Sequence, residues 1–180
     1  MKPPTLTPDS ARYLTSRTPP SPFHLRPLLP WLCGQSATRW YLATWIGTAL
    51  LALGTYLLKP GWQGIAAAAL VLALPSVRFN LTHVVLVDMA ALGLATASAS
   101  LMVHGWIIPA IILALGAPSI QLAATLTAGY AQLLVATDTV RLYQWSAPVV
   151  AIAATSAVDP RWWPLMVIVT LFNPLRGDGV

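Results

Sequence analysis

The sequence predicts an all-α fold: a polytopic transmembrane helical bundle of about five to seven membrane segments, some of them short or re-entrant. Three observations predict this class. Of the 180 residues, 57% are apolar and only 8% are charged, whereas about 25% of residues are charged in soluble domains. The mean hydropathy is +0.69, and uncharged stretches follow one another from residue 40 onward. These observations exclude a soluble globular domain and an intrinsically disordered chain.

Residues 1–39 form a Pro-rich, basic N-terminal segment that we expect at the membrane interface. The segment holds eight of the 16 prolines and five of the ten basic residues. Proline biases the residue before it away from helix, so extended or turn-rich chain is expected. Residues 23–32 mix aromatic, aliphatic and basic side chains, which is typical of chain lying flat on a membrane. A flexible tail is the alternative interpretation.

Residues 40–173 form the predicted transmembrane helical domain. Its clearest segment, residues 40–58, has 19 uncharged residues, which span roughly 28 Å as a helix. Trp40 and Tyr41 open this segment, as expected for an interfacial aromatic belt. Further segments are expected at 62–77, 81–103, 106–115, 120–137, 147–158 and 162–172. Residues 174–180 form a polar C-terminal tail.

Several of these segments are shorter than a membrane span, so tilting or re-entrance is expected for them. Residues 138–145 are predicted to form a polar, aromatic connector, and no internal repeat is evident. Small residues recur at 66–69 and 90–100, which favours close helix packing within the bundle; a homo-oligomer or another helical partner is the alternative.

The charge distribution favours a membrane surface over nucleic acid. All five acidic residues are Asp, the formal net charge is +5, and the basic residues are scattered between apolar stretches. Such a balance suits anionic lipid and lacks the basic stripe of a nucleic-acid binder. We therefore expect membrane lipid as a partner and no nucleic acid. With seven segments and a cytoplasmic N-terminus, the positive-inside rule places Arg78 and Arg161 inside and Lys59, Arg141 and Arg176 outside.

Asp88 is the only acidic residue within a predicted span. Placing an ionisable group inside a membrane costs free energy, so a functional role is the default hypothesis for such a group. His83 precedes it by five residues, so on one helix the two point about 140° apart. They line one cavity only if the helix begins after His83. Arg78, just upstream, is placed to neutralise Asp88. The alternative is an interfacial Asp favoured by a helix N-terminus.

A second polar cluster is predicted around residues 138–145. Asp138 and Arg141 are three residues apart and suit a pair on one helical turn. With Tyr143 and Trp145 they form a group suited to a phosphate or a sugar, or else an ordinary interfacial loop. The sequence shows no soluble-enzyme motif and no metal-ligand spacing, and it does not identify a cofactor. Cys33, the single cysteine, has no partner for a disulfide.

Four stretches taken in order resemble the N-terminal half of bacterial membrane glycosyltransferases of the GT-C type and similar small membrane proteins of actinobacteria and their phages. They are DSARY at 9–13, PFHLRPLLPWL at 22–32, RW at 39–40 and LTHVVLVDMA at 81–90. The resemblance implies a bacterial plasma-membrane protein that uses a sugar linked to undecaprenyl or decaprenyl phosphate. Asp9 would be a base or a metal-linked acid, Asp88 a second carboxylate, and Arg26 or Arg141 a phosphate ligand.

Three functions are therefore carried forward. The first is a glycosyltransferase with catalytic Asp9 and Asp88; its substrate-binding residues would be Arg26, His83, Asp138, Arg141, Tyr143 and Trp145. The second is a non-enzymatic membrane scaffold, complex subunit or phage-encoded membrane factor. A reduced, non-catalytic relative of the GT-C enzymes would belong to this class. The third is a small transporter with proline-broken helices around a mid-membrane site.

Overall fold

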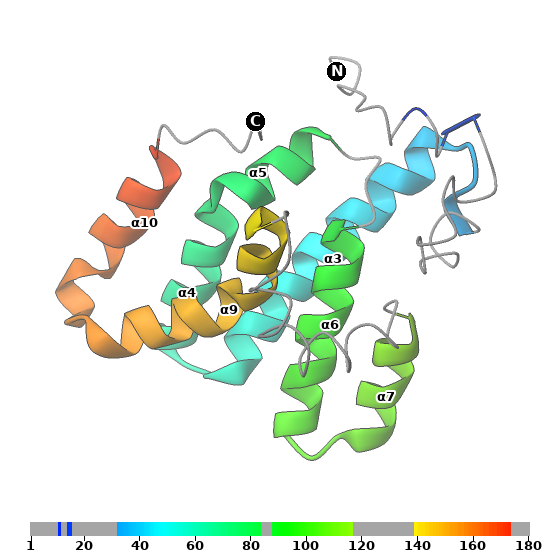
Figure 1. Cartoon of the computed structure of the whole chain (residues 1–180). Helices are drawn as coiled ribbons and strands as arrows, with labels where there is room; N and C mark the ends of the chain where they lie inside the picture. Colours follow the sequence, from blue (N-terminus) through cyan, green and yellow to red (C-terminus); the bar gives the residue numbers. More distant parts are fainter. Residues whose placement is uncertain (1–10, 12–13, 16–31, 84–87, 117–138, 174–180) are drawn as a thin grey trace.

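A computed structural model describes residues 11, 14–15, 32–83, 88–116 and 139–173 (Figure 1). Every regular element in these ranges is helical, which confirms the all-α prediction. The predicted segment 120–137 lies outside the described residues. The elements are α3 (Ala37–Leu58), α4 (Trp62–Ala73), α5 (Pro75–Thr82), α6 (Asp88–Val103), α7 (Ile107–Gly116), α9 (Thr139–Ala157), the 3-10 helix η1 (Pro160–Trp162) and α10 (Trp163–Leu171).

Helix α3 ends at Leu58 as predicted but begins three residues earlier, at Ala37. The earlier start has a local cause: the Ser36 side chain accepts a hydrogen bond from the backbone N–H of Arg39 at 3.4 Å and caps the helix. Among the described helices, α3 alone is long and apolar enough to cross a membrane by itself. A bent pair, α4 with α5, meets the same criterion as one broken span.

The segment predicted at 62–77 is divided between α4 and α5, with a bend of 57° between the two helices. Pro75 is the first residue of α5. Its ring forces Leu74 out of the helical region, to φ −58° and ψ 136°. The chain therefore turns at the residue before the proline and continues as a short second helix.

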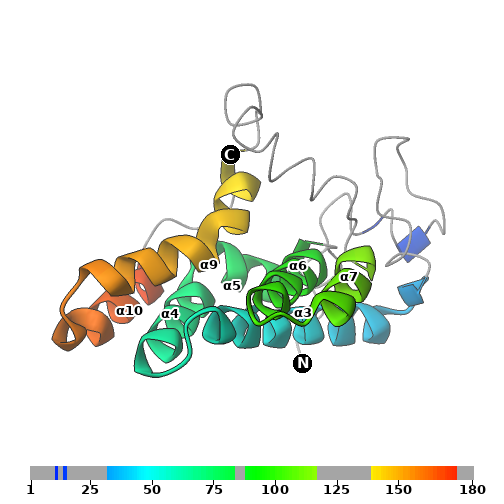
Figure 2. The same cartoon turned by 90° about the horizontal axis from the view of Figure 1, so that it is seen from below.

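Two predicted boundaries are wrong. The segment expected at 81–103 begins at Asp88, and residues 81 and 82 belong to α5. The connector expected at 138–145 is helical from Thr139 onward. In Figure 2 the N-terminal part of α9 projects from the layer formed by α3, α4, α6, α7 and α10. The break expected at 159–161 is confirmed, with η1 between α9 and α10.

Glycines bring α3 and α6 together with their chains running parallel. A Cβ atom on Gly93 would overlap the carbonyl oxygen of Gly47, and a Cβ on Gly54 would lie 2.8 Å from the backbone nitrogen of Ala97. Only glycine permits such an approach, and in lipid this close packing replaces the hydrophobic effect. The small residues of both helices are thus used inside the bundle.

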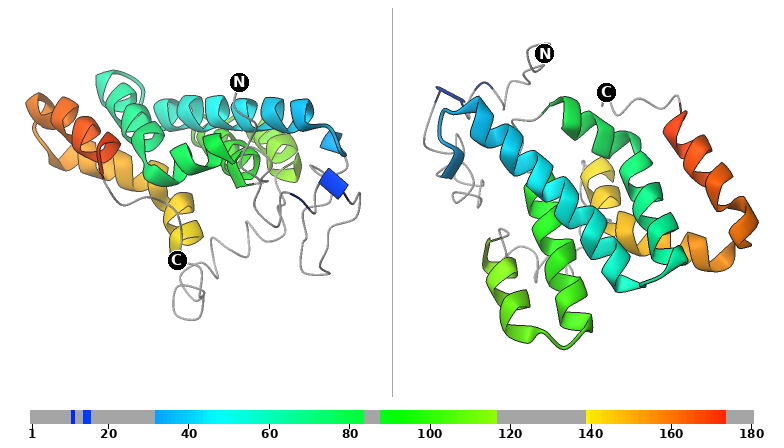
Figure 3. Two further views of the ribbon diagram at one scale, coloured as in Figure 1. Left: turned by 90° about the horizontal axis from the view of Figure 1, so that it is seen from above. Right: turned by 180° about the vertical axis from the view of Figure 1, so that it is seen from behind.

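A cluster of buried apolar side chains joins five helices. Each of the helices α3, α4, α5, α6 and α9 contributes one or two residues to the cluster. The two views of Figure 3 show how these helices are arranged. The cluster contains Leu51, Ala67, Val71, Val77, Met89, Leu92 and Ala151. Near the start of α3, a smaller cluster packs Cys33 against Trp40.

Three turns in the described part follow one pattern, which the sequence analysis missed. In each, a longer helix ends, a polar residue and a Pro or Gly follow, and a Trp opens a shorter helix. The turns are 59–62 between α3 and α4, 104–106 between α6 and α7, and 159–162 between α9 and α10. The recurring signal in the sequence is KPGW, HGW and DPRW. Each turn thus reverses the chain after a long helix.

These three turns lie at the same end of the bundle, toward the lower side of Figure 1. A ring nitrogen of His104 lies 2.7 Å from the carbonyl oxygen of Leu57, which joins the α6–α7 turn to the end of α3. The Gln63 side chain donates to Ser156 and to the carbonyl oxygen of Ile152, which joins the start of α4 to the end of α9. We call this region the turn end.

Candidate functional site

The bundle has an apolar core, and its outer surface also carries many large apolar side chains. Threonine and serine hydroxyls are buried and donate mostly to carbonyl oxygens of the preceding helical turn, as Thr48 does to Thr44 at 2.8 Å. Large apolar side chains cover the outside on several helices. The most exposed include Leu42, Trp45, Leu53, Ile107, Ile108, Ile112, Val149, Ile168, Val169 and Phe172. Such extensive exposed apolar surface marks contact with a partner or with lipid.

The site residues predicted at 83 and 88 lie on either side of a helix break. His83 caps the C-terminus of α5, and Asp88 is the first residue of α6. The helix that contains Asp88 therefore begins after His83. This was the condition given above for both side chains to line one cavity. Asp88 is half-buried in the first helical turn, where the helix dipole favours a negative charge.

The His83 ring is held by local contacts. It stacks on Phe79 with ring centroids 4.0 Å apart. Its Nδ1 lies 3.0 Å from both the Phe79 carbonyl oxygen and the Thr82 hydroxyl. One ring nitrogen is therefore engaged within α5, and the side chain's orientation is fixed by this helix.

Two further polar groups on α5 have unmatched hydrogen-bonding capacity. Asn80 is 3% exposed; its amide nitrogen donates to the Ser76 carbonyl oxygen at 2.9 Å, while its Oδ1 accepts no hydrogen bond from the residues that the structure describes. The buried Nε of Arg78 donates none either. A buried polar atom without a partner is costly and calls for a physical explanation. Arg78, Asn80, His83 and Asp88 together are named the α5–α6 polar segment.

Sequence reasoning found three members of this segment and missed Asn80. A signal was present, because Asn80 is the only asparagine before residue 173 and follows a long apolar stretch. An amide at such a position is expected to make specific hydrogen bonds. Arg78 was considered only as a neutralising charge for Asp88.

The remaining predicted site residues are not brought together by the described structure. Asp9, Arg26 and Asp138 lie outside the described residues. Arg141, Tyr143 and Trp145 belong to the N-terminal part of α9, where the backbone alone is described. Their expected roles stay predictions.

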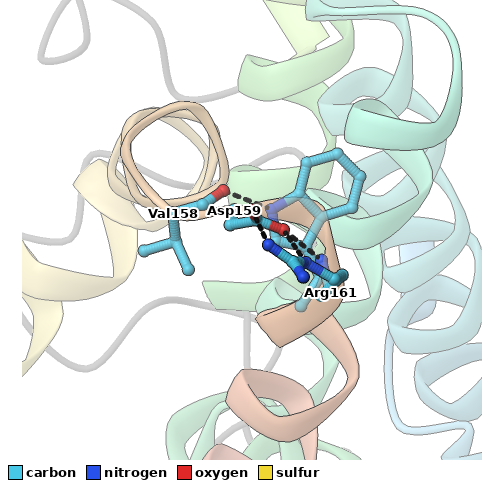
Figure 4. A network of polar contacts seen from close by, with 4 residues as sticks. Val158, Asp159 and Arg161 are labelled. Carbon is cyan, nitrogen blue, oxygen red and sulfur yellow. Dashed lines mark hydrogen bonds and ion pairs between the residues drawn. The ribbon is translucent and has the colours of Figure 1, made fainter.

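The turn end carries an exposed ion pair that organises η1 (Figure 4). Arg161 Nη2 lies 3.0 Å from Asp159 Oδ2, and the Arg161 backbone N–H donates to Asp159 Oδ1 at 3.0 Å. The side-chain hydrogen bond from Arg161 lowers the pKa of Asp159, and the same pair raises the pKa of Arg161. Trp163 completes the turn by donating its indole N–H to the carbonyl oxygens of Thr155 and Val158, both at 3.1 Å.

The contact between α4 and α9 differs from the arrangement expected for seven segments. The seven-segment arrangement places Arg161 opposite Lys59, but the structure places both at the turn end. The reason is that α9 runs antiparallel to α4 and ends where α4 begins.

Metal binding has no support in the described part of the chain, where no three His, Cys, Asp or Glu residues come together. Cys33 is buried, and this burial raises the pKa of its thiol, against a smaller opposing effect of the Arg39 charge. A buried thiol of this kind behaves as a small apolar group.

Comparison with protein-family models, curated proteins and solved structures finds no match to this chain.

Proposed function

We propose that this chain is an integral membrane protein of a bacterial plasma membrane, with its described helices set in lipid. The observation that carries the proposal is the exposed apolar surface. Large Leu, Ile, Val and Trp side chains cover the outside, and Thr and Ser hydroxyls buried among apolar side chains bond to helical carbonyls. In water such a surface drives aggregation, but in a bilayer it is matched to its solvent.

We propose three long and three short membrane segments in the described part of the chain. Helices α3, α6 and α9 have 22, 16 and 19 residues, whereas α4, α7 and α10 have 12, 10 and 9. At 1.5 Å per residue the short helices reach about 14 to 18 Å, or about half of the hydrocarbon core. The short helices thus return from the turn end only part of the way, within the expected five to seven segments.

The activity we propose is glycosyl transfer from a polyprenyl-phosphate-linked sugar, as the GT-C resemblance implies. The supporting observation is the α5–α6 polar segment, with a buried unmatched donor on Arg78 and a buried unmatched acceptor on Asn80. We assign the phosphate to Arg78, because an Arg fork is suited to phosphate oxygens, and a separate sugar or acceptor hydroxyl to Asn80. This places a polar ligand against groups that otherwise remain unsatisfied.

The proposed reaction assigns a role to each member of the segment. The bond between the sugar's anomeric carbon and the phosphate oxygen breaks, and the phosphate leaves with the electron pair, stabilised by Arg78. The acceptor oxygen bonds to the anomeric carbon and gives its proton to the Asp88 carboxylate. Asn80 holds a sugar or acceptor hydroxyl, and His83 orders the end of α5.

Fractionation tests the membrane proposal. After expression in bacteria and extraction of membranes with alkaline carbonate, the chain should stay in the membrane pellet and enter solution only with detergent. Recovery of a monodisperse chain in the aqueous fraction without detergent would contradict membrane integration.

Co-purified lipid and transfer assays test the activity. Mass spectrometry of the detergent-purified protein should detect a retained polyprenyl phosphate, which Arg78→Gln and Asn80→Leu should deplete about tenfold or more. Arg161→Gln, which removes an arginine at the turn end, is the matched control and should retain the lipid. Equal retention by all variants, or none by the wild type, would favour a non-enzymatic scaffold instead.

A further inference from the structure

The three turn tryptophans have the same surroundings. Trp62, Trp106 and Trp162 are 81%, 63% and 57% exposed, and each stands immediately before or at the start of a shorter helix. Their indole N–H groups donate to no residue that the structure describes. Trp40 and Trp163 differ from them, because their indoles donate to backbone carbonyl oxygens within the fold. The indole N–H groups of the turn tryptophans thus make no hydrogen bond within the described fold.

A polar layer and an apolar layer meet at these indoles. Lys59, His104 and the Asp159–Arg161 pair stand in the turns themselves. Exposed apolar side chains occupy the neighbouring helical turns: Leu53, Ile65, Met102, Val103, Ile107, Ile108 and Leu165. An indole between a polar and an apolar layer is the arrangement of an aromatic belt, with the ring body in the acyl boundary and the N–H among headgroups.

Hydrogen bonds hold the three turns together as one edge. The His104 contact to Leu57 links the second turn to the first, and the Gln63 bonds to α9 link the first to the third. The three indoles therefore belong to one end of the bundle and not to three unrelated loops. A planar partner can contact all of them at once.

We infer that the turn end lies in the headgroup region of a phospholipid bilayer, with Trp62, Trp106 and Trp162 as its anchors, on the side away from the cytoplasm. The inference rests on the proposed membrane integration. It adds the depth of the turn end in the bilayer and the side of the membrane that the turn end faces. Charge selects the side. Among the described residues, the turn end carries Lys59 and Arg161.

The sequence that leads into the opposite end is the more basic one. The N-terminal segment that precedes α3 in the sequence contains Lys2, Arg12, Arg17 and Arg26 and no apolar stretch of spanning length. Arg39 stands at the start of α3, and α5 adds Arg78. Excess Lys and Arg mark the cytoplasmic face, so the turn end faces outward.

Cysteine labelling tests the side in a Cys33→Ser background. Lys59→Cys and Ala157→Cys report on the turn end, and Thr38→Cys and Thr82→Cys report on the opposite end; positions 38, 59, 82 and 157 are all exposed. In intact cells a membrane-impermeant maleimide should label positions 59 and 157, and positions 38 and 82 only after permeabilisation. The reverse pattern overturns the assigned side, as does labelling of all four in intact cells.

The depth of a fluorophore in the bilayer tests whether the turn end lies among the lipid headgroups. Bimane is attached to Trp62→Cys, Trp106→Cys, Trp162→Cys and, as the control at the middle of α3, Ile46→Cys, and each protein is placed in phosphatidylcholine–phosphatidylglycerol vesicles. Shallow spin-labelled lipids should quench the three turn positions at least about twofold more than deep ones, with the opposite ratio at Ile46. Equal ratios at all four positions overturn the interfacial level. Alkaline extraction of the same samples reports separately on membrane integration, so the two proposals fail independently.

Discussion

At the scale of single residues, Cys33 is set apart by burial. It is 4% exposed and packs with Trp40, which is fully buried and donates its indole N–H to the Gly34 carbonyl oxygen at 3.0 Å. Sequence analysis identified Cys33 only as unpaired. Its burial depends on the folding of residues 33–40 against each other, and the cysteine itself gives no signal of that.

The first prediction concerns this thiol. Because burial raises its pKa and blocks access, alkylation of native Cys33 at pH 8 should be about tenfold or more slower than in the unfolded chain. Trp40→Leu should speed the reaction, whereas Trp45→Leu, which alters an exposed Trp on the same helix, should not. Equal rates in native and unfolded protein, followed by mass spectrometry, would refute the buried environment.

Asp159 gives a second residue-scale prediction, on pH. Its pKa is lowered by the Arg161 hydrogen bond, so the pair stabilises the turn above the ordinary carboxyl value of 3.8 and is lost as pH falls through the lower folded value. The indole N–H resonance of Trp163 should stay constant from pH 8 to 5 and shift only below about pH 4. Asp159→Asn should show the acid spectrum already at pH 7, whereas Asp88→Asn should leave it unchanged. A shift centred near neutral pH would rule this pair out as the cause.

At the scale of helices, the α3–α6 contact depends on three glycines, Gly47, Gly54 and Gly93, that leave no room for side chains. We predict that Gly93→Ala lowers the free energy of unfolding by about 1 to 3 kcal/mol, because the new methyl group overlaps the Gly47 carbonyl oxygen. Ala99→Leu is the control: it adds a larger group to the same helix at an exposed position. Denaturation in detergent followed by circular dichroism measures both, and equal stability of the two variants would contradict the close contact.

Some helix boundaries were predictable from sequence, and others were not. The end of α3 and the break at 159–161 were correct, because Pro, Gly and charge coincide there. Pro75 also gave a local signal, but hydropathy runs across it and concealed the bend. The start of α6 at Asp88 follows an apolar stretch that looks like continuous helix, and only tertiary packing separates the two helices.

The same limit applies to the candidate site. Asp88 and His83 were found because ionisable groups stand out in an apolar sequence. Asn80 was missed because an amide changes neither the charge nor the hydropathy enough to be noticed. Its importance appears only when its side chain is seen to be buried with an unmatched oxygen.

At the scale of the whole molecule, three turns and their tryptophans give the bundle two different ends. One end carries KPGW, HGW and DPRW, and the other carries Arg39 at the start of α3 and Arg78 on α5. The pattern was not recognised as a repeat because the helices between the turns share no sequence. What recurs is a chain reversal formed by a polar residue, a Pro or Gly, and a Trp. In the proposed arrangement this reversal lies at the membrane interface.

The central claim is that lipid contacts the exposed apolar side chains. Spin labels at Leu42, Leu53, Ile108 and Ile168, introduced as cysteines in Cys33→Ser protein and reconstituted in liposomes, measure this directly; all four positions are at least half exposed. Collision with oxygen, which concentrates in lipid, should exceed collision with a water-soluble nickel complex at all four positions. The account is contradicted if the nickel complex reaches these labels as readily as it reaches a label at Lys59→Cys.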